Sequence, residues 1–174
     1  MVFTATPTIE EGRAFYSDLK SRMAAFGREP DELKIMPGFF VTVGDTQEEA
    51  QEKREVLQRL IHPEVGIALL SQRMGLDLSG YDVDGPLPDV PQDKVISSRV
   101  ALLMDMARRE NMTIRQLYTQ IAGGRGHYDI CGTPAHIADV MQEWFETGAA
   151  DGFNVMPPVF PDSLSDFVDK VVPE

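Results

Sequence analysis

The sequence predicts an α/β protein built on a parallel sheet. Short apolar runs at 2–5, 33–43, 128–131 and 153–156 alternate with longer amphipathic segments, and the first three runs each lead into a small-residue turn and a helix-start signal. Strands that alternate with helices in this way are typical of βαβ units, whose strands lie parallel. With 174 residues, 43% of them hydrophobic, the chain is long enough for one domain with a packed core.

The first unit is a buried strand at 2–5 followed by a helix. Thr8 is a candidate N-cap, and Glu11 three positions later completes a capping-box pattern. Gly27 stands where a left-handed C-terminal cap is expected, and Pro30 blocks continuation of the helix. One face of the helix is apolar at helical spacing and is expected to enter the core: Phe15, Leu19, Met23 and Phe26.

The second unit begins with the apolar run 33–43, which is rich in β-forming residues. The Pro37-Gly38 pair interrupts this run and predicts a kink or bulge. Thr46 and Glu49 give a second capping-box pattern, so a helix is expected next. Pro63 is expected to end it, and its apolar side is formed by Val56, Leu57, Leu60 and Ile61.

The third unit is a strand at 128–131 and a helix that begins after Thr133. Thr133 is a candidate N-cap, and Pro134 suits the first helical position because its missing N–H costs nothing there. Gly148 ends the helix, and a fourth strand at 153–156 and a short helix at 164–172 follow. The apolar stripe of the long helix is Ile137, Val140, Met141, Trp144 and Phe145.

Residues 62–120 break this rhythm and are expected to form a helical and loop insertion. They hold a helical patch at 67–74, a Gly/Pro/Asp-rich loop at 76–93, and helices near 97–109 and 113–121. Long excursions with little regular structure are often functional in barrel enzymes.

Composition excludes several classes of protein. The net charge of −12 argues against nucleic acid and anionic membranes as partners. Without eighteen consecutive apolar residues or a signal peptide, the sequence predicts a cytoplasmic protein. The single cysteine rules out an internal disulfide, and the three histidines lack metal-ligand spacing, so no metal is expected.

The motifs resemble a known family. The segments "VFTATPT", "LKIMPGFFVTVGDTQEEA" and above all "GTPAHIADVMQEWFETGAADGFNVMPPVFPDSLSDFVDKVVPE" are similar to the C-terminal portion of bacterial luciferase-like flavin-dependent monooxygenases, in the nitrilotriacetate and dibenzothiophene-sulfone monooxygenase branch. The resemblance implies the C-terminal half of a (β/α)₈ TIM barrel, from about its fifth strand to its eighth, with residues 1–174 as a single partial barrel domain.

The resemblance also implies a function. Family members are two-component enzymes that oxidise a small organic substrate with O₂ and reduced FMN, which a separate flavin reductase supplies. The family's phosphate site and several flavin and substrate contacts lie in the first half of the barrel, so this chain is expected to need that missing half or to form a homo-oligomer. The alternative is a catalytically inactive half-barrel, or a module that binds flavin or another small molecule.

Candidate site residues follow from the carboxyl ends of the strands, where parallel barrels place their chemistry. Thr4, Ala5 and Met156 lie at two such ends and would point toward a flavin or substrate in a complete barrel. The alternative is that Thr4 caps a helix and Met156 fills the core. Cys131 lies in an apolar strand, which favours a buried inert thiol over a nucleophile.

The stretch "GGRGH" is either a mobile lid or a plain turn. It lacks the third glycine of a dinucleotide fingerprint and precedes its strand, which excludes that motif. Related enzymes are similar in having a glycine-rich, arginine-bearing lid before the seventh strand, so lid or substrate contacts are assigned to Gly123, Gly124, Arg125 and Gly126. Arg125 offers a planar fork for an anionic group and His127 can transfer a proton near neutral pH, which makes these two the catalytic candidates. The alternative for His127 is a partly buried residue at the edge of the strand.

Overall fold

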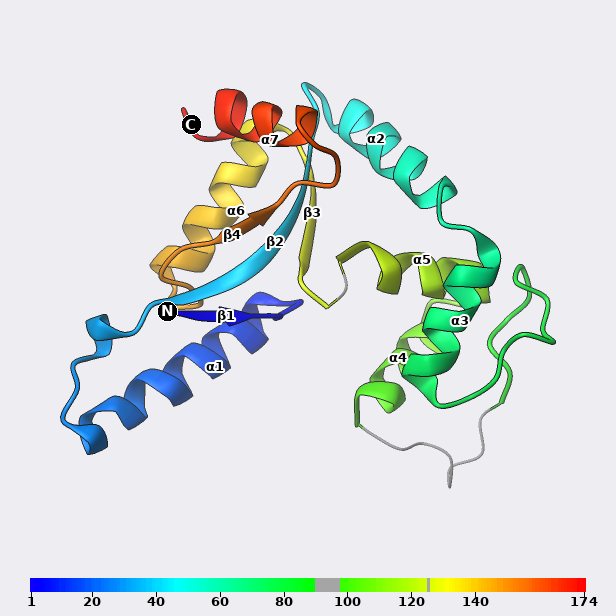
Figure 1. Cartoon of the computed structure of the whole chain (residues 1–174), viewed down its shortest axis with the longest axis horizontal. Coiled ribbons are helices and arrows are strands. Elements are labelled where there is room, and N and C mark those ends of the chain that lie inside the picture. The colour runs from blue at the N-terminus through cyan, green and yellow to red at the C-terminus, as the bar shows by residue number, and fades with distance from the viewer. Residues whose placement is uncertain (90–97, 125) are drawn as a thin grey trace. The chain divides into compact units, whose positions relative to one another are not determined.

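The structure, a computed structural model, describes residues 1–89, 98–124 and 126–174. The chain forms two compact units (Figure 1). The first combines Met1–Leu57 with Gly124–Glu174, and the second is Gln58–Gly123. Each unit has its own hydrophobic core. The expected insertion at 62–120 falls inside the second unit.

The first unit is built around one long central strand. β2 (Ile35–Val43) pairs in parallel with β1 (Val2–Thr4), β3 (Tyr128–Gly132) and β4 (Asn154–Met156) (Figure 1). The four parallel strands expected from the sequence are therefore confirmed. The bulge expected at Pro37-Gly38 is wrong, because β2 runs unbroken through it with one partner for each residue, and the kink stays a prediction. Pro37 is the last residue of β2 that pairs with β1, and Gly38 is the first that pairs with β4. Pairing with β3 begins at the next residue, Phe39.

One edge of β2 pairs with two strands, β1 and β3, and the other edge pairs with β4 alone among the described residues. β3 and β4 both pair with Phe39 and Phe40, so they lie on opposite edges of β2. β1 pairs with positions 35–37 only. The Phe3 ring of β1 stacks on His127, directly before β3, with centroids 5.0 Å apart. β1 and β3 therefore follow one another along the same edge, and the sheet is three strands wide.

One face of the sheet is covered by helices. α1 (Ile9–Arg22), α6 (Pro134–Glu146) and η4 (Phe167–Val171) contribute residues to its core. The short α7 (Asp162–Asp166) leads directly into η4. Phe39 is fully buried at the centre of this core, with the ring of Trp144 edge-on at 5.0 Å. Other members of this core are Val41, Val43, Ile130, Ile137, Phe167 and Val171.

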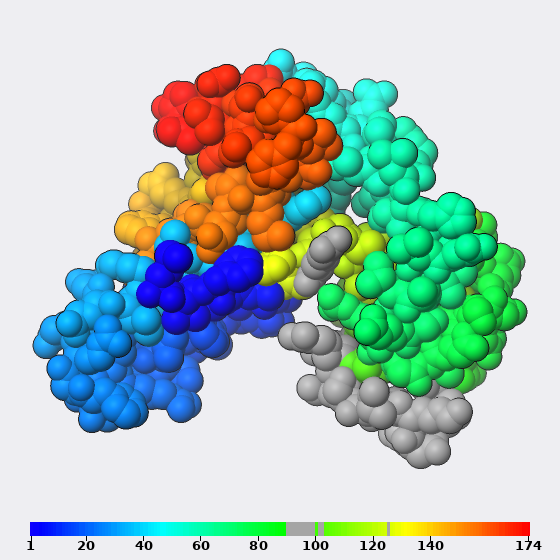
Figure 2. All heavy atoms as spheres, viewed as in Figure 1, coloured from blue at the N-terminus to red at the C-terminus, as the bar shows by residue number. Residues whose placement is uncertain are grey.

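The opposite face of the sheet is called the site face below. Side chains alternate along a strand, so Met36, Gly38, Phe40 and Thr42 of β2 belong to it. Their partners in register extend the site face onto β1 and β4, through Phe3 and Met156. Figure 2 shows the first residues of the chain at the molecular surface, and Phe3 is 55% exposed there.

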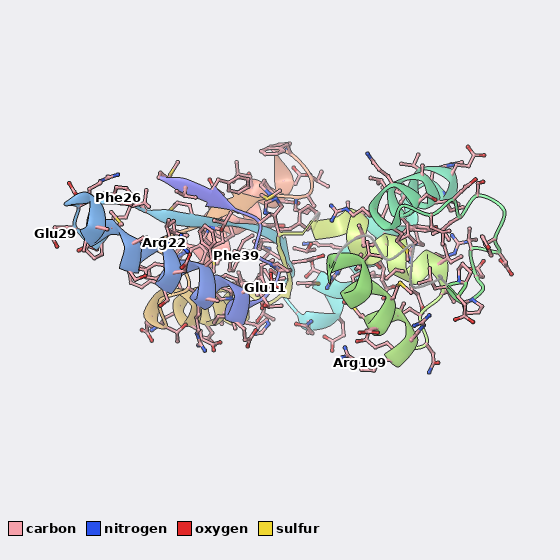
Figure 3. All side chains as sticks on the ribbon, turned by 90° about the horizontal axis from the view of Figure 1, so that it is seen from below. Glu11, Arg22, Phe26, Glu29, Phe39 and Arg109 are labelled. Carbon is pink, nitrogen blue, oxygen red and sulfur yellow. The ribbon has the colours of Figure 1, made fainter. Side chains whose placement is uncertain are left out.

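The expected inward face of the first helix is wrong in part. Phe15 is 39% exposed, and Phe26, in the 3₁₀ turn η1 (Met23–Phe26), is 79% exposed (Figure 3). Met23 is buried as expected, and Gly12 and Lys20, which the apolar pattern did not include, are buried as well. Gly12 fits because its bare Cα lies against the Trp144 ring. The buried face of α1 therefore includes a glycine and a lysine, so apolar periodicity alone does not predict it.

The caps agree with the sequence patterns more closely than the apolar faces do. The hydroxyls of Thr8, Thr46 and Thr133 each accept a hydrogen bond from the backbone N–H three residues later, at 3.1–3.3 Å. Gly27 adopts the expected left-handed cap, with φ of 64°.

α2 (Gln47–Arg59) ends before Pro63, which instead opens α3. Val56, Leu60 and Phe145 were expected in the core and are exposed.

The second unit is helical. It contains α3 (Pro63–Met74), α4 (Ser98–Arg109) and most of α5 (Ile114–Gly124). The segment 76–89 holds turns and one isolated bridge, and the rest of the expected loop lies outside the described residues. A short 3₁₀ turn, η2 (Pro30–Glu32), belongs to the first unit. The core of the second unit includes Leu70, Met74, Leu78, Met104, Ile114, Leu117 and Tyr118.

Candidate functional site

The carboxyl ends of β1 and β4 lie on opposite edges of β2, close to Gly38. Thr4 ends β1 opposite Pro37, and Met156 ends β4 opposite Phe40. β2 continues beyond this level to Val43, paired there with β3. Because parallel α/β proteins place their chemistry at the carboxyl ends of strands, this level of the sheet is the candidate site.

His127 and Met156 come together over Gly38. A Cβ added to Gly38 would overlap Nδ1 of His127 and would lie 2.9 Å from the Met156 sulfur. The His127 ring also stacks on Phe3, with 23° between the ring planes. His127, predicted as a catalytic candidate, and Met156, predicted as a flavin contact, therefore lie side by side. Glycine at position 38 leaves the space that their side chains occupy.

The buried side of the His127 ring constrains its tautomer. Nδ1 is buried and has no hydrogen-bond partner among the residues that the structure describes. A buried N–H without an acceptor costs more than a buried lone pair, so the neutral ring is expected to carry its proton on Nε2.

Residues of β1 divide between the two faces of the sheet. Thr4 and Thr6 are buried, with their hydroxyl oxygens 3.4 Å apart, whereas Phe3 and Ala5 are exposed. Thr4 alternates with Phe3 along β1, so the Thr4 side chain points away from His127. Ala5 lies just beyond the end of β1 and is exposed. Thr4 does not cap the helix, because Thr8 does. Sequence reasoning missed Phe3, because the period-2 alternation places Phe3 and Thr4 on opposite faces of β1 but does not show which face lies toward His127.

The glycine-rich stretch lies between α5 and β3. Gly123 and Gly124 are the last residues of α5, and the Gly124 carbonyl accepts a 2.7 Å hydrogen bond from the His127 backbone N–H. Gly126 has φ of 90°, a conformation that glycine adopts readily. Arg125 lies outside the described residues. The assignment of this stretch as a lid stays a prediction.

Two ionisable groups lie further along β3. Asp129 is bonded at 3.0 Å to Arg54 of α2, and burial raises the Asp129 pKa although Arg54 opposes this. Cys131 is only 8% exposed, and burial raises its thiol pKa. A raised pKa lowers the thiolate fraction, so this thiol has the properties of an inert core residue.

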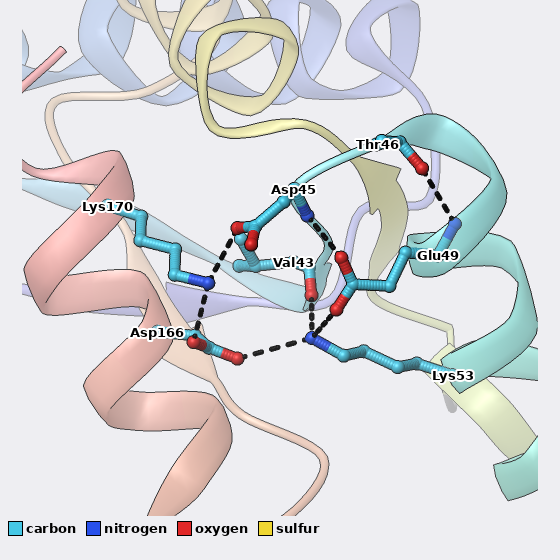
Figure 4. Close-up of polar contacts among 7 residues, drawn as sticks. All are labelled: Val43, Asp45, Thr46, Glu49, Lys53, Asp166 and Lys170. Atoms are coloured by element: carbon cyan, nitrogen blue, oxygen red, sulfur yellow. Dashed lines mark hydrogen bonds and ion pairs between the residues drawn. The ribbon is translucent and has the colours of Figure 1, made fainter.

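A larger charged cluster sits at the carboxyl end of β2 (Figure 4). Lys53 of α2 donates to the Val43 carbonyl at 2.9 Å and forms ion pairs with Glu49 and Asp166. Lys170 of η4 forms ion pairs with Asp45 and Asp166 at 2.7 and 3.2 Å. The Lys170 hydrogen bond lowers the Asp45 pKa. Each lysine is paired with two carboxylates, so neither offers an unpaired positive charge to a ligand. The cluster instead connects α2 to α7 and η4.

The described part of the chain offers neither a metal cluster nor a membrane span. Among these residues there is no group of three or more His, Cys, Asp or Glu side chains placed to hold a metal ion. None of the helices described is both long and apolar enough to cross a bilayer.

The fold and the site together define a class of protein. A parallel α/β scaffold with its candidate site at the carboxyl ends of strands is the arrangement of barrel enzymes. The sequence profile of the luciferase-like monooxygenases matches residues 1–151, and the chain belongs to that family.

Curated relatives and solved structures agree with this assignment. The chain is 49% identical to nitrilotriacetate monooxygenase component A of Aminobacter aminovorans and 48% identical to N-acetyl-S-(2-succino)cysteine monooxygenase of Bacillus subtilis, over 100% and 99% of its length. It spans only 39% and 40% of those proteins. The crystal structure of DmoA from Hyphomicrobium sulfonivorans superposes with a TM-score of 0.79, at 28% identity, covering 98% of this chain and 36% of that one. These neighbours are TIM-barrel enzymes, so the predicted partial barrel is confirmed.

Proposed function

We propose that the chain is the part of a two-component FMN-dependent monooxygenase that forms one side of the flavin and substrate site. The proposal rests on one observation, the convergence of His127 and Met156 over Gly38, with Phe3 stacked on His127, near the carboxyl ends of β1 and β4. Reduced FMN would come from a separate flavin reductase, and a small organic substrate would be oxidised with O₂.

The residues at Gly38 fit the ring of a flavin. Phe3 and His127 present stacked planar rings, and the Met156 thioether adds a polarisable apolar contact. Ala5, just after β1, would add a small side chain to this surface. Nε2–H of His127 would donate to a carbonyl oxygen of the ring. Bound reduced flavin would supply the electrons that activate O₂. Arg125 and the glycines around it would cover the site and exclude water.

The relatives support the proposed chemistry in general terms. Two proteins near half identity are named as monooxygenases of nitrilotriacetate and of N-acetyl-S-(2-succino)cysteine, and a solved neighbour is described as riboflavin lyase with modified FMN. Because this chain spans 39% of the first relative, the rest of the site would come from further barrel elements. The same coverage keeps a second function open, a half-barrel that binds flavin without turnover.

Flavin binding is the first test of the proposal. FMN fluorescence titrated with the chain should show saturable binding, and His127→Ala should weaken it about tenfold, the effect expected for one hydrogen bond and one ring contact. His136→Ala is the matched control, since His136 is exposed on α6 and should leave binding unchanged. Equal effects of the two variants would assign the site elsewhere.

Oxygen uptake distinguishes the two functions. Uptake that requires both a flavin reductase and a candidate substrate supports the monooxygenase. FMN binding without such uptake, measured after the missing barrel elements are supplied, supports the binding module. No affinity at millimolar FMN would overturn the claim that this chain alone carries flavin contacts.

A further inference from the structure

Met156 differs from most methionines of the chain in its surroundings. The chain has nine methionines, and three of them are buried: Met23, Met74 and Met104. Met156 is partly exposed and belongs to neither of the described hydrophobic cores. Its thioether, on the site face beside Gly38, is therefore more accessible to a small oxidant than the thioethers of the cores.

The Met156 sulfur has the imidazole of His127 as its neighbour. The sulfur and Nδ1 of His127 both lie within 2.9 Å of the position that a Cβ would take on Gly38, so they are separated by less than twice that distance. Nδ1 is buried and has no hydrogen-bond partner among the described residues. A thioether is only a weak acceptor, so this contact leaves the proton of the neutral ring on Nε2.

Oxidation of the sulfur would change the chemistry of this contact. Hydrogen peroxide transfers one oxygen atom to a methionine thioether. The sulfur loses two electrons, the O–O bond of the peroxide breaks, and water leaves. The sulfoxide oxygen that results is a hydrogen-bond acceptor. An acceptor beside Nδ1 favours the tautomer with its proton on Nδ1, because the partner of one ring nitrogen decides which of the two is protonated.

We propose that Met156 is a site of reversible oxidation, whose sulfoxide accepts a hydrogen bond from Nδ1–H of His127 and so moves the imidazole proton from Nε2 to Nδ1. The oxidant is hydrogen peroxide. The inference goes beyond the proposed function and does not rest on it, because the step needs no flavin. Its effect on the site is to change Nε2 of His127 from a hydrogen-bond donor to an acceptor.

Peptide mapping measures the oxidation. The 174-residue chain is treated with dilute hydrogen peroxide, and mass spectrometry follows the sulfoxide at each methionine. Met156 should be oxidised at least about tenfold faster than the fully buried Met74, and Met1, which is 81% exposed, gives the rate of an open site. Oxidation of Met156 no faster than that of Met74 would overturn the inference.

Nitrogen NMR measures the tautomer. At pH 8, where an ordinary imidazole is neutral, the shifts of the two ring nitrogens show which one carries the proton. The untreated chain should have the His127 proton on Nε2 and the oxidised chain should have it on Nδ1. His136, which is exposed, should keep the same shifts in both samples. Methionine sulfoxide reductases should return His127 to its first state.

Two leucine variants separate Met156 from general oxidation. Met156→Leu keeps an apolar side chain of similar volume but forms no sulfoxide, so peroxide should leave its His127 tautomer unchanged. Met36→Leu is the matched control. Met36 is also a partly exposed residue of the site face, but its sulfur lies against Gly152, so the change at His127 should persist in this variant. Unfolding midpoints check that both variants fold.

The outcomes separate this inference from the proposed function. An unchanged tautomer in a chain oxidised at Met156 overturns the inference, even if the chain binds FMN. A change that persists in Met156→Leu, or that Met36→Leu abolishes, overturns it as well. A change of tautomer that leaves the affinity for FMN unaltered upholds the inference and contradicts the proposed hydrogen bond from Nε2 to the flavin.

Discussion

Gly38 and the imidazole of His127 occupy adjoining space so closely that no side chain fits between them. Gly38→Ala should therefore displace the ring and cost about 1–3 kcal/mol, the usual penalty of overpacking. Denaturant unfolding measures the cost, and the His127 ring resonances report the displacement. Gly80→Ala is the control, because a Cβ there meets nothing within 4 Å. Unchanged ring resonances in Gly38→Ala would refute the packing argument.

Asp151 should control stability at acid pH. It forms a 2.9 Å ion pair with Lys20, both side chains being 8% exposed, and it accepts hydrogen bonds from Ile35 N–H and the Tyr16 hydroxyl. Burial alone would raise the Asp151 pKa, but these bonds and Lys20 lower it below its ordinary value of 3.8. Asp151→Asn should cost about 3 kcal/mol at pH 7, because it leaves Lys20 buried without its countercharge.

The sign of the pH effect follows from the lowered pKa. The contribution of Asp151 is complete above its ordinary value of 3.8 and is lost as pH falls through the lower value of the folded protein. The stability difference between the wild type and Asp151→Asn should therefore shrink as pH falls from 5 to 2. Asp139→Asn, at an exposed position of α6, should show no such trend. A difference that stays constant across this range would contradict the assignment.

Phe39 should be among the most costly residues to truncate. It is fully buried and its ring contacts those of Trp144, Tyr128 and Phe153 at 4.6–5.0 Å. Phe39→Ala should destabilise the first unit by about 3–5 kcal/mol. The fluorescence emission of Trp144, the single tryptophan of the chain, reports the unfolding of this unit. Phe26→Ala, at a 79% exposed phenylalanine, should change stability by less than about 0.5 kcal/mol.

Cys131 should react slowly while the protein is folded. The thiol is buried, which blocks access, and its pKa is raised, which lowers the thiolate fraction at neutral pH. Labelling by a disulfide reagent at pH 7.5 should be at least about a hundredfold slower than in denaturant. Labelling in the native state at the rate of the unfolded chain would point to an exposed, activated thiol.

The sequence predicted those features that depend on local chemistry. Helix starts at Thr8, Thr46 and Thr133 were predictable because a capping hydroxyl bonds to a neighbour three residues away. The inward face of α1 was not, because Gly12 is selected by contact with Trp144, far away in the chain. Lys20 is buried for the same kind of reason, through its ion pair with Asp151.

The candidate site was predicted by residue type more than by position. His127 and Met156 were named for separate reasons, and only the register of the strands places both at Gly38. Thr4 was named because it ends a strand, but alternation turns its side chain to the covered face. Phe3 was missed, since nothing in the sequence shows which side of β1 faces His127.

The two hydrophobic cores have no residue in common. A substitution inside one core should therefore act first on the stability of the unit that contains it. Replacements in region 58–123 that keep its own core packed are expected to be tolerated. Natural variation in a lineage that carries this arrangement should be concentrated in that region, where new specificities can be explored at little cost to the scaffold.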